Sequence, residues 1–288
     1  MTDFLEFTGE RFTPECVREI WLEHWHRYAF ATSFARDRRV LDAACGEGYG
    51  SALLARHARS VVGLDVSATT IEHAKRRYAA PNLHYAVADV TALDQMANAS
   101  FDLIVSFETL EHVARQSEML AGFRRLLAPG GLLLVSTPDK RTYTDLTGVV
   151  NEHHVRELYR PEFEALIEAH FPVHRLLAQK LLFQSVLWDP DCAPTFSRAA
   201  TMHPDRIDPK LDYDALYYIA LCAMDPGDIE LGPGHVHLFG DAAESVYRHY
   251  NDEIRKHIAA GHRLVAQENQ IAALQAEIAR LNAALQQR

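Results

Sequence analysis

Residues 40–51, VLDAACGEGYGS, decide the fold. They read as a short apolar strand, an acid at the strand's exit, and three glycines at alternate positions that lead into a helical run at 51–57. Glycine tolerates positive φ and lets the backbone approach a ligand closely, so such a turn predicts a nucleotide-like cofactor. The dinucleotide pattern G-x-G-x-x-G fits poorly, because its third glycine position, counted from Gly46, is Ser51.

Short β-rich runs alternate with helical segments on both sides of this turn. The runs cover residues 40–41, 61–64, 83–87, 101–107 and 132–136. This rhythm predicts a parallel sheet covered on both faces, with ligands at the carboxyl ends of the strands. Four acids stand at such ends: Asp42, Asp65, Asp89 and Glu108.

The flanking regions have different compositions. Residues 1–39 form a predicted N-terminal cap whose aromatic stripe indicates core packing or, alternatively, a helix folded over the cofactor. Residues 188–213 are rich in Pro and Asp and predict a surface insertion. The domain should therefore span 1–240, followed by a helical segment at 241–288.

The C-terminal segment predicts a coiled coil. Leu264, Ile271, Ile278 and Leu285 repeat every seven residues, with Leu274 and Leu281 at the second seam positions. The repeat favours a homo-oligomer, with a helix packed on its own domain as the alternative. Since the repeat still runs at the last residue, we expect a piece of a longer coiled-coil protein.

The bulk composition narrows the class of function. A formal net charge of -10 gives no sign of a nucleic-acid binder. The four cysteines form neither a C-x-x-C pair nor a disulfide framework. The acidic start MTDFLEF and the lack of a run of ~20 apolar residues predict a cytoplasmic protein without a transmembrane segment, peripheral to the inner membrane face through partners.

The spacing D-x-x-x-G-x-G-x-G, with Asp42 ahead of Gly46, resembles motif I of the class I S-adenosylmethionine-dependent methyltransferases. VVGLDVS and ADV match the acids that bind the ribose and the adenine in that class, and LLAPGGLLLVSTP matches the following turn and strand. The resemblance implies a Rossmann-like α/β fold with a seven-stranded, mostly parallel sheet, whose last two strands form an antiparallel pair at one edge. It assigns cofactor contacts to Arg11, Tyr28, Asp42, Gly46, Gly48, Asp65, Val66, Asp89, Val90 and Phe107.

The stretch FETLEHV after the fourth strand carries the predicted chemistry. Glu108, Glu111 and His112 stand at i, i+3 and i+4, on one face of a helical turn. With His154 from N-x-x-H-V-R-E-L, they resemble the metal site of the small-RNA ribose 2′-O-methyltransferases and of the ubiquinone-pathway O-methyltransferases. The resemblance implies these four residues as metal ligands and Glu111, His112 and His154 as catalytic. Their mixed oxygen and nitrogen set suits Mn, Fe, Co or Zn at least as well as Mg.

Two alternatives to the metal site stay open. His112 could act as a general base without metal while the glutamates bind substrate, or Glu111 and His112 could form a pair on a helix surface.

The motifs GERF-x-PE, H-R-Y-A-F-A and SFETLEHV resemble methyltransferases found with bacterial surface-polysaccharide assembly enzymes. This implies O-methylation of a sugar hydroxyl, with a glycan as acceptor. The alternatives are a small-molecule O-methyltransferase acting on a catechol-like diol and a non-catalytic S-adenosylmethionine-binding scaffold whose role is the coiled coil.

Overall fold

The computed structural model describes residues 13, 19–187, 201–202, 206–208, 211–231 and 235–286. The chain divides into two compact units, Met1–Phe239 and Gly240–Arg288. The second unit contains one helix, α6 (Ser245–Gln286). Within the described residues, no helix is both long and apolar enough to cross a membrane.

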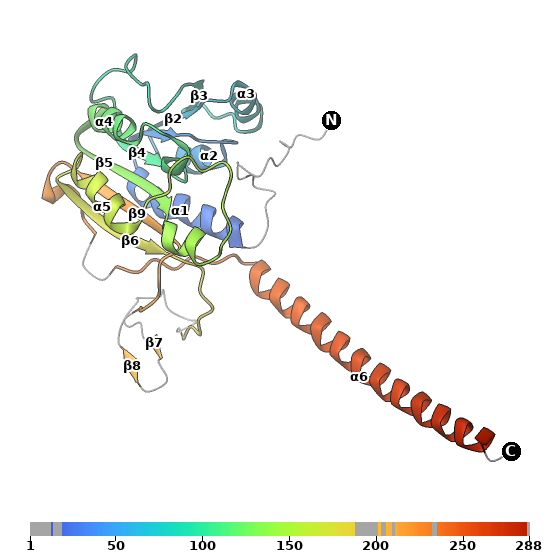
Figure 1. Ribbon diagram of the computed structural model, residues 1–288. Helices are drawn as coiled ribbons and strands as arrows, with labels where there is room; N and C mark the ends of the chain where they lie inside the picture. The colour runs from blue at the N-terminus through green and yellow to red at the C-terminus, as the bar shows by residue number, and fades with distance from the viewer. Residues whose placement is uncertain are drawn as a thin grey trace. The chain divides into compact units, whose positions relative to one another are not determined.

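A seven-stranded sheet forms the centre of the first unit, in the order β3-β2-β1-β4-β5-β9-β6 (Figure 1). All neighbouring pairs are parallel except β5–β9 and β6–β9, which confirms the predicted sheet with its antiparallel edge. The strands are β1 (Arg39–Ala43), β2 (Ser60–Asp65), β3 (Leu83–Val87), β4 (Phe101–Ser106), β5 (Leu127–Pro138), β6 (Val173–Gln179) and β9 (Tyr217–Ala223).

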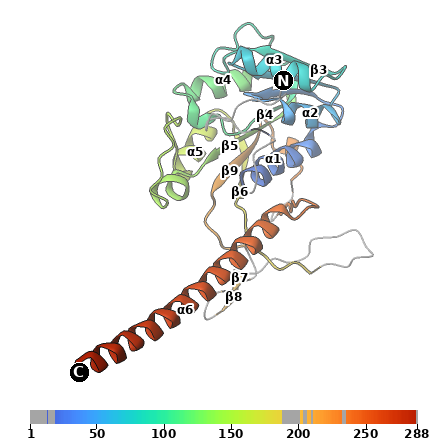
Figure 2. The same ribbon diagram turned by 90° about the vertical axis from the view of Figure 1, so that its right-hand side faces the viewer.

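Helices cover both faces of this sheet. Successive buried residues of a strand point to opposite faces, and each face packs against its own group of helices in one of two apolar clusters. In β5, Leu132 and Leu134 point into the cluster shared with α1, α2 and α3, whereas Leu133 and Val135 point into the cluster shared with α4 and α5. Figure 2 shows the two helix groups on opposite sides of the strands. The helices are α1 (Glu19–Ala35), α2 (Tyr49–Ala55), α3 (Ala68–Arg77), α4 (Gln116–Leu126) and α5 (Arg160–Glu168).

Shorter elements complete the described part of the first unit. Within the predicted insertion, two short described strands pair in an antiparallel manner, and the remainder of 188–213 lies largely outside the described residues. The elements are η1 (Leu110–His112), η2 (Arg141–Asp145), η3 (Pro226–Asp228), β7 (Thr201–Met202) and β8 (Ile207–Asp208).

Candidate functional site

The glycine turn joins β1 to α2 through left-handed backbone. Gly46 has φ 54° and Gly48 has φ 97°. A Cβ added to Gly48 would lie 2.8 Å from both the Ala74 Cβ and the Tyr85 hydroxyl oxygen. Glycine is therefore required at Gly48 by conformation and by space.

Asp42 is fully buried beneath this turn and holds it to α1. Its two carboxylate oxygens accept hydrogen bonds from the Tyr28 hydroxyl (3.0 Å) and from the Ser51 hydroxyl (2.6 Å). Burial raises the pKa of Asp42 to about 7. Tyr28 and Asp42, two of the predicted cofactor contacts, therefore hydrogen-bond to each other and support the glycine turn from below.

Asp65 lies at the carboxyl end of β2, beside the glycine turn. It accepts hydrogen bonds from the backbone N–H groups of Gly46 (3.1 Å) and Ser67 (2.9 Å). Val66, the next residue, is 73% exposed. A carboxylate oxygen has two lone pairs, so Asp65 can still accept hydrogen bonds from a diol.

Asp89 follows the neighbouring strand β3, in a loop. Its Oδ1 accepts hydrogen bonds from the Thr91 amide (2.8 Å) and hydroxyl (2.7 Å), which lower the pKa of its carboxyl. Val90 is buried beside it. Because β2 and β3 pair in parallel, Asp65 and Asp89 lie at the same edge of the sheet.

Two predicted cofactor contacts remain. Phe107, at the end of β4, is buried and packs edge-on against the Tyr28 ring, with 5.1 Å between centroids. Arg11 lies outside the described residues.

Three of the four predicted metal ligands come together. One ligand atom each of Glu111, His112 and His154 lies within 4.8 Å of the others. Glu111 and His112 come from η1, directly after β4, and His154 comes from the loop after η2. The backbone closes this loop on η1, since the amides of Val155 and Arg156 donate to the Glu111 carbonyl (2.8 and 3.0 Å).

Neighbouring groups orient both imidazoles. His112 Nδ1 lies 3.0 Å from the His153 backbone carbonyl oxygen, which can only accept, so Nδ1 donates this hydrogen bond and Nε2 is the ring nitrogen that a cation would bind in the neutral imidazole. His154 Nδ1 lies 2.5 Å from a Glu157 carboxylate oxygen, and His154 Nε2 lies 3.0 Å from the Asn151 side-chain nitrogen, a contact that a bound cation would replace. Such partners fix the orientation of metal-binding histidines, so this cluster fits a divalent cation.

Glu111 is the buried acid of this cluster. Its Oε2 accepts a hydrogen bond from the Thr137 hydroxyl (3.3 Å). Burial raises the pKa of Glu111 well above its usual range, and the nearby Glu108 carboxyl adds to this shift. A bound cation would offset this burial penalty.

Glu108 does not join the other three residues. It precedes η1 with φ 50°, so it lies outside the helical turn on which the sequence pattern placed it. Its Oε1 accepts a hydrogen bond from the Ser136 hydroxyl (2.6 Å) and lies 3.6 Å from an Arg27 guanidinium nitrogen.

Arg27 is a site residue that sequence reasoning missed. Its side chain is fully buried on α1, over the Tyr217 ring, and its Nε donates to the side-chain Oε1 of Gln179 (2.8 Å). Nη1 and Nη2 have no hydrogen-bond partner within the described part of the chain. Only the motif H-R-Y-A-F-A pointed toward this residue, and it did not single out the arginine.

Glu47, inside the glycine motif, was also missed. Its buried carboxylate lies 2.8 Å from His73 Nε2, 2.6 Å from Arg77 Nη1 and 2.8 Å from the Tyr78 hydroxyl. These contacts fasten the glycine turn to α3. The sequence signal for this residue was an acid placed between Gly46 and Gly48.

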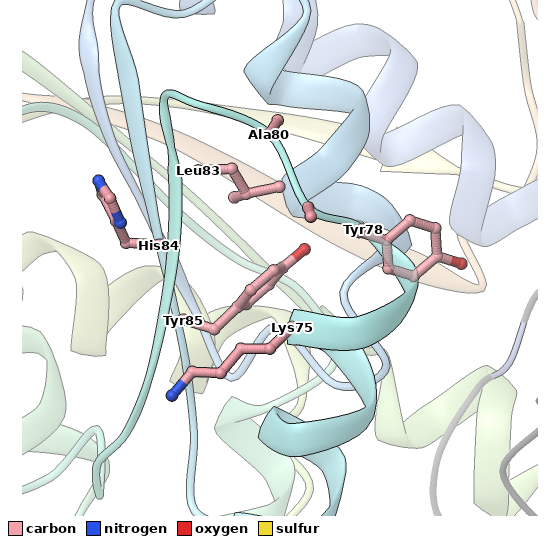
Figure 3. Close-up of a pocket in the computed structure, with 7 residues that line it drawn as sticks. Lys75, Tyr78, Ala80, Leu83, His84 and Tyr85 are labelled. Atoms are coloured by element: carbon pink, nitrogen blue, oxygen red, sulfur yellow. The ribbon is translucent and has the colours of Figure 1, made fainter.

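A surface pocket of about 360 Å³ lies between α3 and β3 (Figure 3). Tyr78, Lys75, His84 and Tyr85 are among its lining residues. The Tyr85 hydroxyl donates to the Gly48 carbonyl oxygen (2.9 Å), so this pocket lies behind the glycine turn.

Two cysteines are described, and both are buried and free: Cys45 in the glycine turn and Cys222 in β9. Burial raises the pKa of both thiols. Cys16 and Cys192 lie outside the described residues.

Comparisons with known proteins find similarity to methyltransferases. A family model described as "Methyltransferase domain" matches residues 41–135. A "Probable S-adenosylmethionine-dependent methyltransferase" from Mycolicibacterium smegmatis is 36% identical over 167 residues, which cover 57% of this chain and 64% of that protein. A "Ubiquinone biosynthesis O-methyltransferase" from Coxiella burnetii is 34% identical over 125 residues, covering 43% of this chain and 53% of that protein.

Similarity to solved structures supports the fold. A chain in a complex of the Haloferax volcanii Trm112 methyltransferase activator with a methyltransferase superposes with a TM-score of 0.50 at 18% identity, covering 75% of this chain and 92% of that one. The chain spans less than two thirds of the length of the curated relatives named above. The first unit therefore shares its fold with a solved methyltransferase complex, and residues 41–135 within it match a methyltransferase-domain model.

Proposed function

We propose that this chain transfers the methyl group of S-adenosylmethionine to a hydroxyl oxygen, with the help of a divalent cation. The observation that carries the proposal is the cluster of Glu111, His112 and His154. It lies after β4 and β5, next to the strand ends that hold the predicted cofactor contacts. Relatives named as ubiquinone biosynthesis O-methyltransferases favour oxygen as the acceptor atom.

The residues of the cluster have distinct roles in this proposal. When bound, Mn, Fe, Co, Zn or Mg would lower the pKa of an acceptor hydroxyl, as metals do for water. Glu111 supplies a carboxylate oxygen, and His112 and His154 supply ring nitrogens whose orientation is set by the His153 carbonyl and by Glu157.

The cofactor would lie along the carboxyl ends of β1, β2 and β4. Asp65 offers its remaining lone pairs to the ribose hydroxyls, and the exposed Val66 offers apolar surface to the adenine. The glycine turn allows the backbone to approach the cofactor closely.

The acceptor class rests on the sequence motifs. Their resemblance to enzymes of surface-polysaccharide assembly supports a sugar hydroxyl of a bacterial surface glycan. A vicinal diol could present two oxygens to one cation, which suits the mixed ligand set.

The test is a methyl-transfer assay on lipid-linked glycan acceptors, with and without chelator, using Glu111→Ala and His154→Ala. We expect chelation and both substitutions to lower the rate by about a hundredfold or more. Chelation removes the metal, and each substitution removes one of its ligands. His153→Ala is the matched control, because its side chain lies outside the cluster while its backbone carbonyl remains.

Direct binding separates the outcomes. Manganese titration followed by electron paramagnetic resonance should show a site in the native chain that both variants lose. Full activity in chelator, with no manganese site, would favour His112 as a metal-free general base instead. Failure of S-adenosylhomocysteine to bind in calorimetry would reject methyl transfer as a whole.

Two rival functions have their own signatures. A small-molecule O-methyltransferase would methylate catechol-like diols faster than glycans in the same assay. A non-catalytic scaffold would bind S-adenosylhomocysteine but transfer no methyl group to either acceptor class.

We also infer that the C-terminal helix assembles the chain into a homo-oligomer. The heptad positions that predicted a coiled coil are exposed along α6. This inference does not depend on the acceptor.

A further inference from the structure

Helix α6 presents an uncovered aliphatic stripe. It is one continuous helix of 42 residues (Figure 1). Six aliphatic side chains recur at the two seam positions of a heptad, each 48–69% exposed: Leu264, Ile271, Leu274, Ile278, Leu281 and Leu285. Exposed aliphatic residues at this spacing mark a helix face that another helix covers.

We propose that a second copy of this chain covers the stripe, in a parallel, in-register, two-stranded coiled coil over residues 264–285. The proposal rests on the homo-oligomer inferred above and adds the number of chains and their direction. Three features of the heptad support it.

The first feature is the choice of aliphatic residues. With Leu264 as position a, the central a positions hold Ile271 and Ile278, and the d positions between and after them hold Leu274 and Leu281. β-Branched residues at a with leucine at d favour two parallel strands over three or four.

The second feature is a polar residue in the seam. Gln267 occupies a d position. In a parallel, in-register pair it meets the same glutamine of the second copy, and the two amides can hydrogen-bond to each other. In an antiparallel or shifted pair it would face an aliphatic side chain, which leaves a buried amide without a partner.

The third feature is charge at the flanking positions. Arg263 is at g and Glu268 at the following e, both exposed, and neither forms an ion pair with another described residue. A parallel pair brings Arg263 of each chain next to Glu268 of the other, because g contacts the e position five residues later. An antiparallel pair places g against g, which removes this match.

The direction also determines how two first units are joined. Each unit precedes α6 in the chain, so parallel pairing connects both to the same end of a paired segment about 33 Å long. Two active sites attached to one end can act together on a single multivalent acceptor, which raises the effective concentration of the second site.

Sedimentation of the full chain measures the number of strands. We expect a mass twice the 32.5 kDa of one chain. The double substitution Leu274→Glu with Ile278→Glu should return the mass to one chain, while S-adenosylhomocysteine affinity stays unchanged. A single-chain mass for the native protein would overturn the homo-oligomer itself, whereas a three- or four-chain mass would overturn only the two-stranded pairing.

Disulfide cross-linking measures direction and register. In a background of Cys16→Ser and Cys192→Ser, Leu264→Cys and Leu285→Cys should each give a covalent dimer on mild oxidation, because each seam position meets itself. Ala273→Cys, on the outer face of the helix, is the matched control and should stay monomeric on a denaturing gel. A two-chain mass without cross-linking at either seam position would overturn the parallel, in-register arrangement.

Discussion

Replacing Gly50 by alanine tests the packing beneath the glycine turn. Gly50 lies in the first turn of α2, and an added Cβ would lie 2.1–2.5 Å from three atoms of the Tyr28 ring. Ordinary carbon–carbon contacts are about 3.5–4.0 Å, so the ring would have to move by more than about 1 Å. The ring is buried and also packs on Tyr49 and Phe107, with 5.1 Å between centroids in each case.

The expected cost follows from these contacts. Overpacking in a core costs about 1–3 kcal/mol. Moving the ring also disturbs the buried hydrogen bond from Tyr28 to Asp42, worth about 1 kcal/mol. Alanine regains about 0.5–1 kcal/mol as a better helix former. We therefore expect Gly50→Ala to lower the free energy of unfolding by about 1–3.5 kcal/mol.

Urea unfolding of the native chain and its variants measures this difference. Gly122→Ala is the matched control, because it also lies in a helix and its added Cβ meets nothing within 4 Å. It should be neutral or slightly stabilising. Gly50→Ala in a Tyr28→Ala background should cost almost nothing further. If Gly50→Ala proved as stable as Gly122→Ala, the steric argument would be refuted.

Three further outcomes concern two buried acids and one acid that we propose to bind the cofactor. Burial raises the pKa of Glu23 from 4.5 to about 7, so the folded state holds a proton that the unfolded state releases between these values. The free energy of unfolding should fall as pH rises through that window, and Glu23→Gln should reduce the fall by up to about 3 kcal/mol in urea titrations at several pH values. Asp42 has the same sign and remains in that variant, so an unchanged slope would contradict the role of Glu23. Glu47→Ala leaves Arg77 and His73 without their buried acid and should cost about 3 kcal/mol in the same assay, with Glu72→Ala on exposed surface as the control. Asp65→Ala should weaken S-adenosylhomocysteine binding roughly 30-fold in calorimetry, since about 2 kcal/mol of hydrogen bonding is lost, and an unchanged Kd would exclude Asp65 from the cofactor site.

The sheet was predictable because its signals are local. Each strand of the parallel part is an apolar run closed by an acid or a turn, and the glycine pattern fixes where β1 turns into α2. The antiparallel edge was predictable only by resemblance, because the partners β6 and β9 are separated by a long segment of different composition.

The candidate site was predictable only in part, since side-chain direction depends on distant contacts. The cluster at Glu111 follows from a short motif and a histidine in a later loop. Glu108 belongs to the same motif, yet its left-handed backbone and its bond to Ser136, 28 residues away, turn it toward Arg27. Arg27 depends on Gln179, 152 residues away, and nothing near it in the sequence signals that contact.

The two buried thiols make the glycine turn observable in solution. Cys45 lies inside the turn, whereas Cys222 lies near the end of β9, and both are almost fully shielded from solvent. A thiol reagent can modify each one only when its surroundings open, so the two labelling rates report two different opening events. In a Cys16→Ser, Cys192→Ser background, labelling of Cys45 alone would measure local opening of the turn. S-adenosylhomocysteine bound against the turn would slow the labelling of Cys45. The labelling rate of Cys222 would serve as an internal reference for global unfolding.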